Sequence, residues 1–212
     1  MTHEPTVFIV DDDPEVRRSL QWLIESVDLS VRVFASAQEF LDTYDSDCPG
    51  CLVLDVRMPG ISGLDLQRHL QSEEIRIPII IVTAHGDVPM AVRAIKDGAI
   101  DFIEKPVSDQ LILDLIQRAI QRDREDRASW AVADIINKRK ELLTQREHQV
   151  MELVILGMSS KEIAADLGVS FKTIEAHRAN IMKKMQAKSV PQLIQINLQT
   201  PPIGTKNQLL PN

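Results

Sequence analysis

Residues 48–60 of this 212-residue chain read CPGCLVLDVRMPG, an apolar run that ends at an aspartate. The apolar residues before Asp55 predict a short strand that is buried on both faces. The Met-Pro-Gly sequence at 58–60 predicts a turn that leaves the Asp55 carboxylate displayed at the end of this strand. The same stretch holds Cys48 and Cys51, a CxxC pair that can be a redox dithiol or half of a metal site. Two different chemistries therefore lie within a few residues of each other.

Apolar runs of the same kind recur along the first 120 residues. They are TVFIV (6–10), VRVF (31–34), CLVLD (51–55), IPIIIV (77–82) and AIDFI (99–103). The segments between them repeat apolar residues with the period of an amphipathic helix, as in PEVRRSLQWLIESV at 14–27. Five strand–helix units of this length predict an α/β domain with a doubly wound, five-stranded parallel sheet.

The net charge of −7 conceals an acidic half and a basic half. Residues 1–120 hold 10 Lys and Arg against 21 Asp and Glu, whereas residues 121–212 hold 14 against 10. This asymmetry predicts two domains with different partners and makes the basic half the candidate for binding nucleic acid. The sequence contains neither an apolar run of membrane-spanning length nor the features of a secretory signal. Two cysteines are too few to build a disulfide framework, and without an export signal we expect a cytoplasmic protein.

Strand patterns do not continue into the second half of the chain. We expect the α/β domain at 1–121, a helical linker at 122–140 and an all-helical domain at 141–199. The linker prediction rests on a helical and increasingly charged pattern that ends in ADIINKRK at 133–140. The Pro-rich segment TPPIGTKNQLLPN predicts a flexible tail at 200–212.

Polar side chains follow four of the predicted strands, at the edge where ligands bind in open α/β sheets. They are Asp11, Asp12 and Asp13 after the first run, Asp55 after the third, Thr83 after the fourth and Lys105 after the fifth. Two carboxylates ~4 Å apart repel by about 4 kcal/mol at an effective dielectric of roughly 20, so this edge needs a compensating cation. Mg²⁺ fits, because it typically binds one or two carboxylates together with phosphate oxygens. The set therefore predicts phosphoryl transfer onto Asp55, with Thr83 and Lys105 binding the product oxygens.

The CxxC pair is the other candidate chemistry in this stretch. A redox CxxC normally begins a helix, where the helix dipole lowers the pKa of the first thiol, but this pair leads into a strand. A structural zinc would need two more ligands, and the sequence has no second CxxC or paired His/Cys motif. We interpret Cys51 as a small hydrophobic residue of the strand. A thiol sensor through Cys48 and Cys51 remains an alternative hypothesis.

The segment KEIAADLGVSFKTIEAHRANIMKKM at 161–185 has the spacing of a helix-turn-helix. Ala164 is a small residue facing the second helix, Gly168 makes the turn, and Ile174 packs back into the core. Ser170 is placed to cap the second helix, whose outer face would enter the major groove of DNA. This face comprises Lys172, Thr173, Glu175, Ala176, Ala179, Asn180 and Lys183. The alternative is a helical hairpin with a solvated basic face.

The acidic half resembles the receiver domain of two-component response regulators. The motifs IVDDD, LVLDVRMPGISGLDL and IVTAHGDVPMAVRAIKDGAIDFIEKP occur in order, and the resemblance covers residues 5–122. It implies the flavodoxin-like fold, with phosphate accepted on Asp55 from a histidine kinase. It also implies Mg²⁺ held by Asp12, Asp55 and the backbone carbonyl of Arg57, with Asp11 acting through water.

Three further positions match this family. Thr83 and Phe102 match its switch pair, in which the hydroxyl moves to the phosphate and the aromatic ring turns inward behind it. Lys105 matches the family's lysine and precedes Pro106, where the family has a cis peptide bond. Asp13 matches no assigned role, and a helix cap is its simplest interpretation.

The basic half resembles the four-helix LuxR-type DNA-binding domain. The resemblance is carried by LTQREHQVMELVILGMSSKEIAADLGVSFKTIEAHRANIMKKM at 143–185 and extends over about 141–199. Together the two halves resemble the FixJ/NarL-type class of response regulators, and specifically its FixJ-like branch. This implies a phosphorylation-activated transcription regulator that binds promoter DNA and forms a homodimer when phosphorylated. The expected dimer face comprises Met90, Arg93, Ala94 and Asp97.

An enzyme remains the competing interpretation of the acidic site. Aspartyl-phosphate phosphatases on a similar sheet usually carry a second acid two residues after the nucleophile. Arg57 occupies that position here. We therefore expect the chemistry to stop at phosphorylation and slow self-hydrolysis, and the protein not to be an enzyme.

Overall fold

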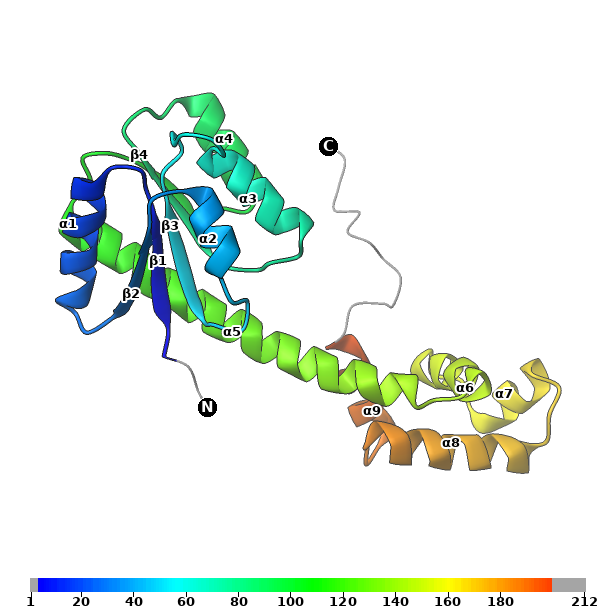
Figure 1. The fold of residues 1–212 in the computed structure, drawn as a ribbon. Coiled ribbons are helices and arrows are strands. Elements are labelled where there is room, and N and C mark those ends of the chain that lie inside the picture. The colour runs from blue at the N-terminus through cyan, green and yellow to red at the C-terminus, as the bar shows by residue number, and fades with distance from the viewer. Residues whose placement is uncertain (1–3, 200–212) are drawn as a thin grey trace. The chain divides into compact units, whose positions relative to one another are not determined.

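The computed structural model describes residues 4–199, which divide after Arg127 into two compact units. The first unit is an α/β domain in which strands alternate with helices (Figure 1). Its strands are β1 (Thr6–Val10), β2 (Ser30–Phe34), β3 (Gly50–Leu54), β4 (Ile79–Thr83) and β5 (Asp101–Glu104). Its helices are α1 (Pro14–Glu25), α2 (Ala37–Thr43), α3 (Gly63–Ser72), α4 (Val88–Lys96) and α5 (Asp109–Glu141), which continues beyond Arg127.

The sheet has the doubly wound topology that the sequence predicts. All neighbouring strands pair in parallel, in the order β2-β1-β3-β4-β5. The strand order reverses between β1 and β3, where ligands bind in open α/β sheets. The register pairs Val10 at the end of β1 with Leu54 at the end of β3. The residues that follow these strands, Asp11 and Asp55, therefore lie next to each other.

Two hydrophobic clusters cover the two faces of the sheet, because successive strand side chains point to opposite faces. On β1, Phe8 and Val10 belong to one cluster, and Val7 and Ile9 belong to the other. Helices α2, α3 and α4 contribute to the first cluster, and α1 and α5 contribute to the second (Figure 1). Every residue of β1, β3 and β4 is buried, which explains why these strands read as continuous apolar runs.

One residue of the expected dimer face does not reach the surface. Ala94 is fully buried in the first cluster, and its backbone carbonyl accepts a hydrogen bond from Gln67 Nε2 at 2.9 Å. The placement of Ala94 on an exposed face was wrong, because α4 packs onto the domain through this position. The residues of this segment that are exposed or half-exposed include Val88, Met90, Val92, Arg93, Ile95 and Asp97.

The second unit is helical. After α5 come α6 (Gln145–Ile155), α7 (Ser160–Asp166), α8 (Phe171–Met185) and α9 (Val190–Leu198). Helix α5 runs without a break through the predicted linker at 122–140, and Ile136 near its end belongs to the core of the second unit. The predicted helix-turn-helix is present as α7 and α8, with Gly168 in the left-handed conformation at the turn and Ser170 capping α8. The predicted tail at 200–212 lies outside the described residues.

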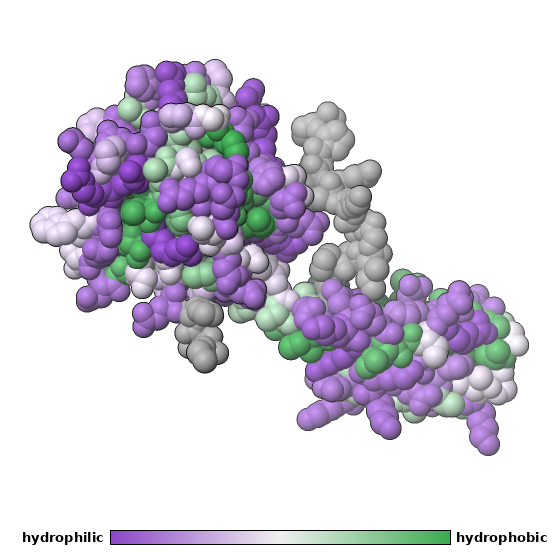
Figure 2. Space-filling view, viewed as in Figure 1, coloured by the Kyte–Doolittle hydropathy of each residue, from purple (hydrophilic) through white to green (hydrophobic). Residues whose placement is uncertain are grey.

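Polar residues cover much of the surface seen in one view of the structure (Figure 2). Hydrophilic residues predominate on the face of each unit drawn in Figure 2. Large apolar side chains that stay exposed include Trp22 on α1 and Leu156 after α6. Within residues 4–199, no helix is long and apolar enough to cross a membrane.

Candidate functional site

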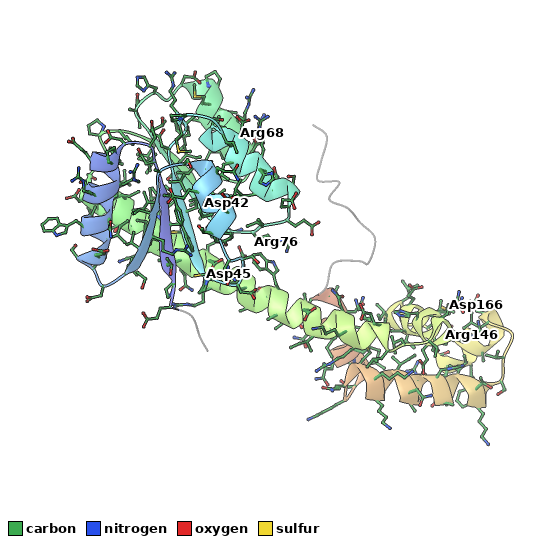
Figure 3. All side chains as sticks on the ribbon, in the orientation of Figure 1. Asp42, Asp45, Arg68, Arg76, Arg146 and Asp166 are labelled. Atoms are coloured by element: carbon green, nitrogen blue, oxygen red, sulfur yellow. The ribbon has the colours of Figure 1, made fainter. Side chains whose placement is uncertain are left out.

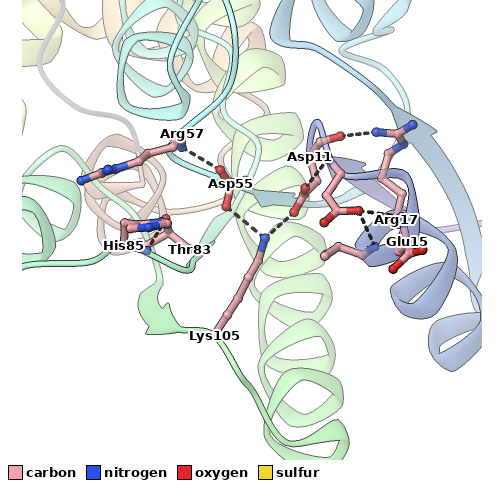
Figure 4. A network of polar contacts seen from close by, with 10 residues as sticks. Asp11, Glu15, Arg17, Asp55, Arg57, Thr83, His85 and Lys105 are labelled. Carbon is pink, nitrogen blue, oxygen red and sulfur yellow. Dashed lines mark hydrogen bonds and ion pairs between the residues drawn. The ribbon is translucent and has the colours of Figure 1, made fainter.

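The predicted acidic site assembles around one lysine. Lys105 Nζ lies 2.6 Å from Asp11 Oδ2 and 3.0 Å from Asp55 Oδ1, so the ammonium bridges the carboxylates that follow β1 and β3 (Figure 4). The carboxylates are nearly buried, with side chains 4% and 7% exposed, whereas the lysine side chain is 20% exposed. The Lys105–Pro106 peptide bond is cis, as the resemblance implied. Three predicted site residues therefore meet at the switch point of the sheet.

The protonation of this cluster follows from burial and the shared lysine. Burial raises the pKa of Asp55 above its ordinary value, and the hydrogen bond and charge of Lys105 offset only part of this rise. Burial acts to lower the pKa of Lys105, but its bonds to Asp11 and Asp55 outweigh it and raise that pKa. The lysine therefore stays charged between the two carboxyl groups.

The three consecutive acids after β1 occupy different positions. Asp11 is buried, and its Oδ1 accepts a hydrogen bond from the backbone N–H of Asp13 at 2.9 Å. Asp12 is exposed at the same edge of the sheet. Asp13 caps α1, accepting from the N–H groups of Glu15 and Val16, so its interpretation as a helix cap is confirmed. The Arg17 Nη1 donates to the carbonyl of Asp11 at 2.7 Å and fixes this turn to α1 (Figure 4).

The loop after β3 holds the other side of Asp55. The backbone N–H of Arg57 donates to Asp55 Oδ2 at 2.6 Å, so each carboxylate oxygen has a partner. Gly63 at the start of α3 packs directly on this residue, since a Cβ there would lie 2.0 Å from the Asp55 carbonyl oxygen. The side chain of Arg57 is exposed. The loop therefore fixes the Asp55 carboxylate in one orientation.

The two residues predicted to form a switch lie close together. Thr83 is fully buried at the end of β4, and its Oγ1 accepts from the backbone N–H of His85 at 3.4 Å. Phe102 on β5 is half-buried, and its ring packs over Gly86. A Cβ at position 86 would lie 2.8 Å from Phe102 Cε1 and 3.6 Å from Thr83 Cγ2. Gly86 therefore lies against both the aromatic ring and the threonine methyl group, a role the sequence pattern did not reveal.

The cysteines lie at the opposite end of β3. Cys51 is fully buried in the strand, and burial raises the pKa of its thiol far above the ordinary value, which disfavours the reactive thiolate. Cys48 is half-buried in the preceding turn, and both cysteines are free. Among the described residues, no group of three or more His, Cys, Asp or Glu side chains could hold a metal ion by side chains alone. This part of the chain thus offers neither a second half for a zinc site nor an activated thiol at Cys51.

The second unit presents the predicted outer face of α8 to solvent. Ile174, Ile181 and Met185 are buried in the helical core. The exposed positions on the other side of the helix include Lys172, Thr173, Glu175, Ala176, Ala179, Asn180 and Lys183. All seven predicted DNA-contact residues are therefore accessible on one helix.

A buried carboxylate that the sequence analysis missed fixes α8 to α6. Glu147 is 3% exposed, and its Oε2 accepts from Lys184 Nζ at 2.6 Å and from the Thr144 N–H at 2.8 Å. The Thr-x-x-Glu capping box at 144–147 was the available sequence signal. Arg146, labelled in Figure 3, donates from Nη2 to the Leu167 carbonyl at 2.8 Å and ties α6 to the turn before α8. These contacts orient the exposed helix on the unit.

We expect Glu147→Gln to lower the free energy of unfolding of the second unit by about 2 kcal/mol at neutral pH, the typical value of hydrogen bonds to a charged group. Burial acts to raise the pKa of Glu147, but the bonds from Lys184 and Thr144 outweigh it and lower that pKa. A lowered pKa contributes stability above the pKa of the unfolded chain, and this is lost as pH falls through the folded value. The difference between the two proteins should therefore shrink in acid.

Urea unfolding followed by the fluorescence of Trp130 in a Trp22→Phe background measures this difference. Glu152→Gln is the matched control, because Glu152 lies on the same helix but is exposed. A pH-independent difference, or a variant as stable as the control, would contradict the proposed role of Glu147.

Comparisons with known proteins agree with this geometry. Residues 7–117 match the response regulator receiver domain, and residues 141–197 match the bacterial regulatory proteins of the luxR family. The chain belongs to the response regulators with a LuxR-type DNA-binding domain. Proteins of this family are transcription regulators and not enzymes, so this response regulator controls transcription in a phosphorylation-dependent way. Its two domains imply two partners, a histidine kinase and DNA.

Full-length relatives support the assignment over most of the chain. The response regulator is 47% identical over 191 residues to nodulation protein W of Bradyrhizobium diazoefficiens, covering 90% of this chain and 84% of the relative. It is 43% identical over 196 residues to the transcriptional regulatory protein FixJ of the same organism, covering 92% of this chain and 96% of the relative. Among solved structures, the response regulator StyR matches with a TM-score of 0.79 and 43% identity, covering 92% of this chain and 99% of that chain.

Proposed function

We propose that Asp55 is the phosphoacceptor of this response regulator and that its phosphorylation by a histidine kinase increases DNA binding through α8. The observation that carries the proposal is the buried Asp55 carboxylate at the end of β3, held 3.0 Å from Lys105 Nζ beside Asp11. A buried acid with its pKa raised by burial and a cation in contact is the kind of group found at functional sites. We also propose a cytoplasmic location, because the protein would encounter both promoter DNA and the phosphorylated kinase in the cytoplasm.

The chemistry proposed at this site is a single displacement. An Asp55 oxygen attacks the phosphorus of the kinase phosphohistidine, a P–O bond forms, and the P–N bond breaks with its electron pair left on the imidazole nitrogen. Lys105 lies beside the attacking carboxylate and would stabilise the charge that develops on the phosphoryl oxygens. Thr83, at the end of the next strand, would donate its hydroxyl to a product oxygen.

The residues at this edge fit Mg²⁺, which receiver domains generally bind at the phosphorylation site. The donors are all oxygen, and the two carboxylates of Asp12 and Asp55 agree with the number that Mg²⁺ typically takes from a protein. We propose that the backbone carbonyl of Arg57 completes the protein ligands and that Asp11 acts through water. The bound ion would neutralise charge on the phosphoryl oxygens. Lys105 brings one positive charge to Asp11 and Asp55, and Asp12 adds a third carboxylate at the same edge. The negative charge at this edge therefore favours binding of a second cation.

Phosphorylation then changes a surface of the receiver. The phosphate adds about −1.5 to −2 charge at Asp55. We propose that Thr83 moves toward it and that Phe102 turns inward behind the threonine, which repacks α4 and β5. Homodimerisation would follow on the face that includes Met90, Arg93 and Asp97. The apolar side chains of Val92 and Ile95 are exposed on the same helix and support an interaction surface there.

DNA binding is assigned to the exposed face of α8. Lys172 and Lys183 would contact phosphates, which fixes the helix in the major groove. The smaller residues between them, with Asn180, would lie against base edges. Glu175 would accept a hydrogen bond from cytosine N4.

The proposal is tested on the unmodified protein. The full chain is incubated with acetyl phosphate, with Mg²⁺ or with a chelator, and its mass and its affinity for DNA are measured. The DNA is a duplex that the phosphorylated protein enriches from a random-sequence pool. We expect one phosphoryl group to be added with Mg²⁺, little with the chelator, and tighter DNA binding only after phosphorylation. Equal DNA affinity of both forms would overturn the proposed control of binding.

A further inference from the structure

The CPGC turn, which the phosphorylation chemistry does not use, contacts helix α5. Arg127 Nη2 donates to the carbonyl of Cys48 at 2.9 Å, and Nη1 donates to the carbonyl of Asp47 at 3.4 Å. The Gly50 N–H donates to Asp123 Oδ2 at 2.9 Å. Figure 3 labels Asp45 in the same loop, which lies beside α5. Two side chains one turn apart on α5 therefore bind the backbone that leads into β3.

The two α5 side chains also bind each other in a buried setting. Arg127 Nε lies 2.8 Å from Asp123 Oδ2, and the aspartate side chain is only 1% exposed. A second pair on this helix, Arg122 and Asp126, has the same spacing of four residues but side chains 68% and 38% exposed. A carboxylate is buried at a high desolvation cost unless it is paired, so the Asp123–Arg127 pair is a specific contact and the other is a surface one.

The turn that receives this pair cannot adjust freely. Gly50 has φ +149°, and a Cβ there would lie 1.8 Å from the Thr6 carbonyl oxygen. The Thr6 N–H in turn donates to the Pro49 carbonyl at 2.9 Å. The turn is thus fixed on β1, and this fixes the positions of the backbone groups that α5 binds. Burial raises the pKa of the adjacent Tyr44 to about 12, while the nearby Arg127 acts in the opposite direction, so the arginine faces a neutral phenol.

The Asp123–Arg127 pair lies on the part of α5 that follows its hydrophobic contacts with the sheet. Ile120 is the last residue of α5 in the hydrophobic cluster on the sheet, and Asp123 and Arg127 lie beyond it. Beyond Ile120 the attachment of the helix to the first unit includes these polar contacts to the turn at 47–50. Losing them would let the helix pivot or fray from Ile120 onward.

We propose that the CPGC turn is the site on the receiver that binds the linker helix α5. Asp123 and Arg127 are positioning residues that hold α5 in one direction relative to the sheet. This inference rests on the proposed function, because the direction of α5 matters only if phosphorylation of the receiver controls DNA binding. A helix bound to this turn transmits a change in receiver dimerisation to the DNA-binding unit, whereas a helix that pivots from Ile120 does not. The CxxC motif therefore acts through its backbone and its glycine, not through its thiols.

The test uses two variants and two matched controls in the full chain. Asp123→Asn removes the charge of the aspartate and keeps its shape, and Arg127→Gln removes the guanidinium that binds Asp123 and the two carbonyls. Asp126→Asn and Arg122→Gln make the same changes in the exposed pair. Three quantities are measured: hydrogen exchange of the Gly50 amide and of residues 121–131, phosphate incorporation from acetyl phosphate, and the gain in DNA affinity on phosphorylation. The DNA is the duplex enriched by the phosphorylated protein.

We expect each buried-pair variant to speed exchange of the Gly50 amide by about 10-fold or more, since the acceptor is then either uncharged or no longer held by Arg127, and this hydrogen bond opens locally more often. Phosphate incorporation should equal that of the wild type, because Asp55 lies at the other end of β3. The gain in DNA affinity should fall by about 5-fold or more, and both controls should behave as wild type. Arg127→Lys keeps the charge but loses the forked contact to two carbonyls, so it should restore part of the gain.

Two results would overturn the inference, and they can be told apart from failure of the proposed function. A variant with fast Gly50 exchange, normal phosphate incorporation and an undiminished gain in DNA affinity shows that the contact between α5 and the CPGC turn is not needed for the control of DNA binding. A variant that loses phosphate incorporation as well shows a general structural defect instead of a positioning role. If the wild type itself gains no DNA affinity on phosphorylation, the proposed function is wrong, and the inference that rests on it is wrong too.

Discussion

Asp55→Asn is expected to abolish phosphate incorporation and, with it, any change in DNA binding on treatment with acetyl phosphate. The neutral amide is too weak a nucleophile to attack phosphorus, whereas the carboxylate that it replaces is the group to which we assign the attack. The fold should persist, since an asparagine keeps the shape of the side chain and can accept from the Arg57 N–H. Mass measurement after labelling detects the loss directly.

Asp13→Asn is the matched control for this variant. Asp13 lies at the same edge but caps α1, and asparagine is as good a cap as aspartate. The control should incorporate phosphate at the wild-type level. If Asp55→Asn still gained an acid-stable, hydroxylamine-sensitive phosphate, the acceptor would be another carboxylate.

Ala176→Asp is expected to weaken DNA binding by about 100-fold or more without unfolding the second unit. Ala176 is exposed in the middle of the face of α8 that we assign to the major groove. A new carboxylate there meets phosphates and base acceptors of like charge, and several kcal/mol is the usual cost of such a contact. About 1.4 kcal/mol corresponds to each tenfold loss of affinity, which gives the expected size.

Ala131→Asp separates this effect from a general change in charge. Ala131 is an exposed alanine in a helix of the same unit, on α5, and the substitution adds the same charge. Fluorescence anisotropy with the enriched duplex should show wild-type affinity for this control. Equal losses for both variants, or none for Ala176→Asp, would show that the exposed face of α8 does not enter DNA.

The parts of the structure that depend on local pattern were predictable from sequence. Buried parallel strands read as continuous apolar runs, so the ends of β1 and β3 could be located, and with them Asp11 and Asp55. The cap at Ser170 and the turn at Gly168 follow from short-range chemistry and were equally predictable. Sequence periodicity was not sufficient for α4, where Ala94 faces the core because the helix packs at an angle that the pattern does not specify.

Contacts between distant residues could not be read from the sequence. The bond from Gly50 to Asp123 joins residues 73 apart, and the pair of Glu147 and Lys184 is separated by 37 residues. Their geometry depends on how the helices pack, which single-residue preferences do not determine. The bridging position of Lys105 between two carboxylates is of the same kind, because proximity at a sheet edge was predictable but the sharing of one ammonium group was not.

The affinity of the full chain for its enriched DNA duplex, measured before and after acetyl phosphate with the modified residue located by peptide mass mapping, tests the proposed control of DNA binding by Asp55. We predict one phosphoryl group on the peptide that contains Asp55 and tighter binding by the modified protein. Phosphate on a different residue, or unchanged DNA affinity while Asp55 is phosphorylated, would contradict it.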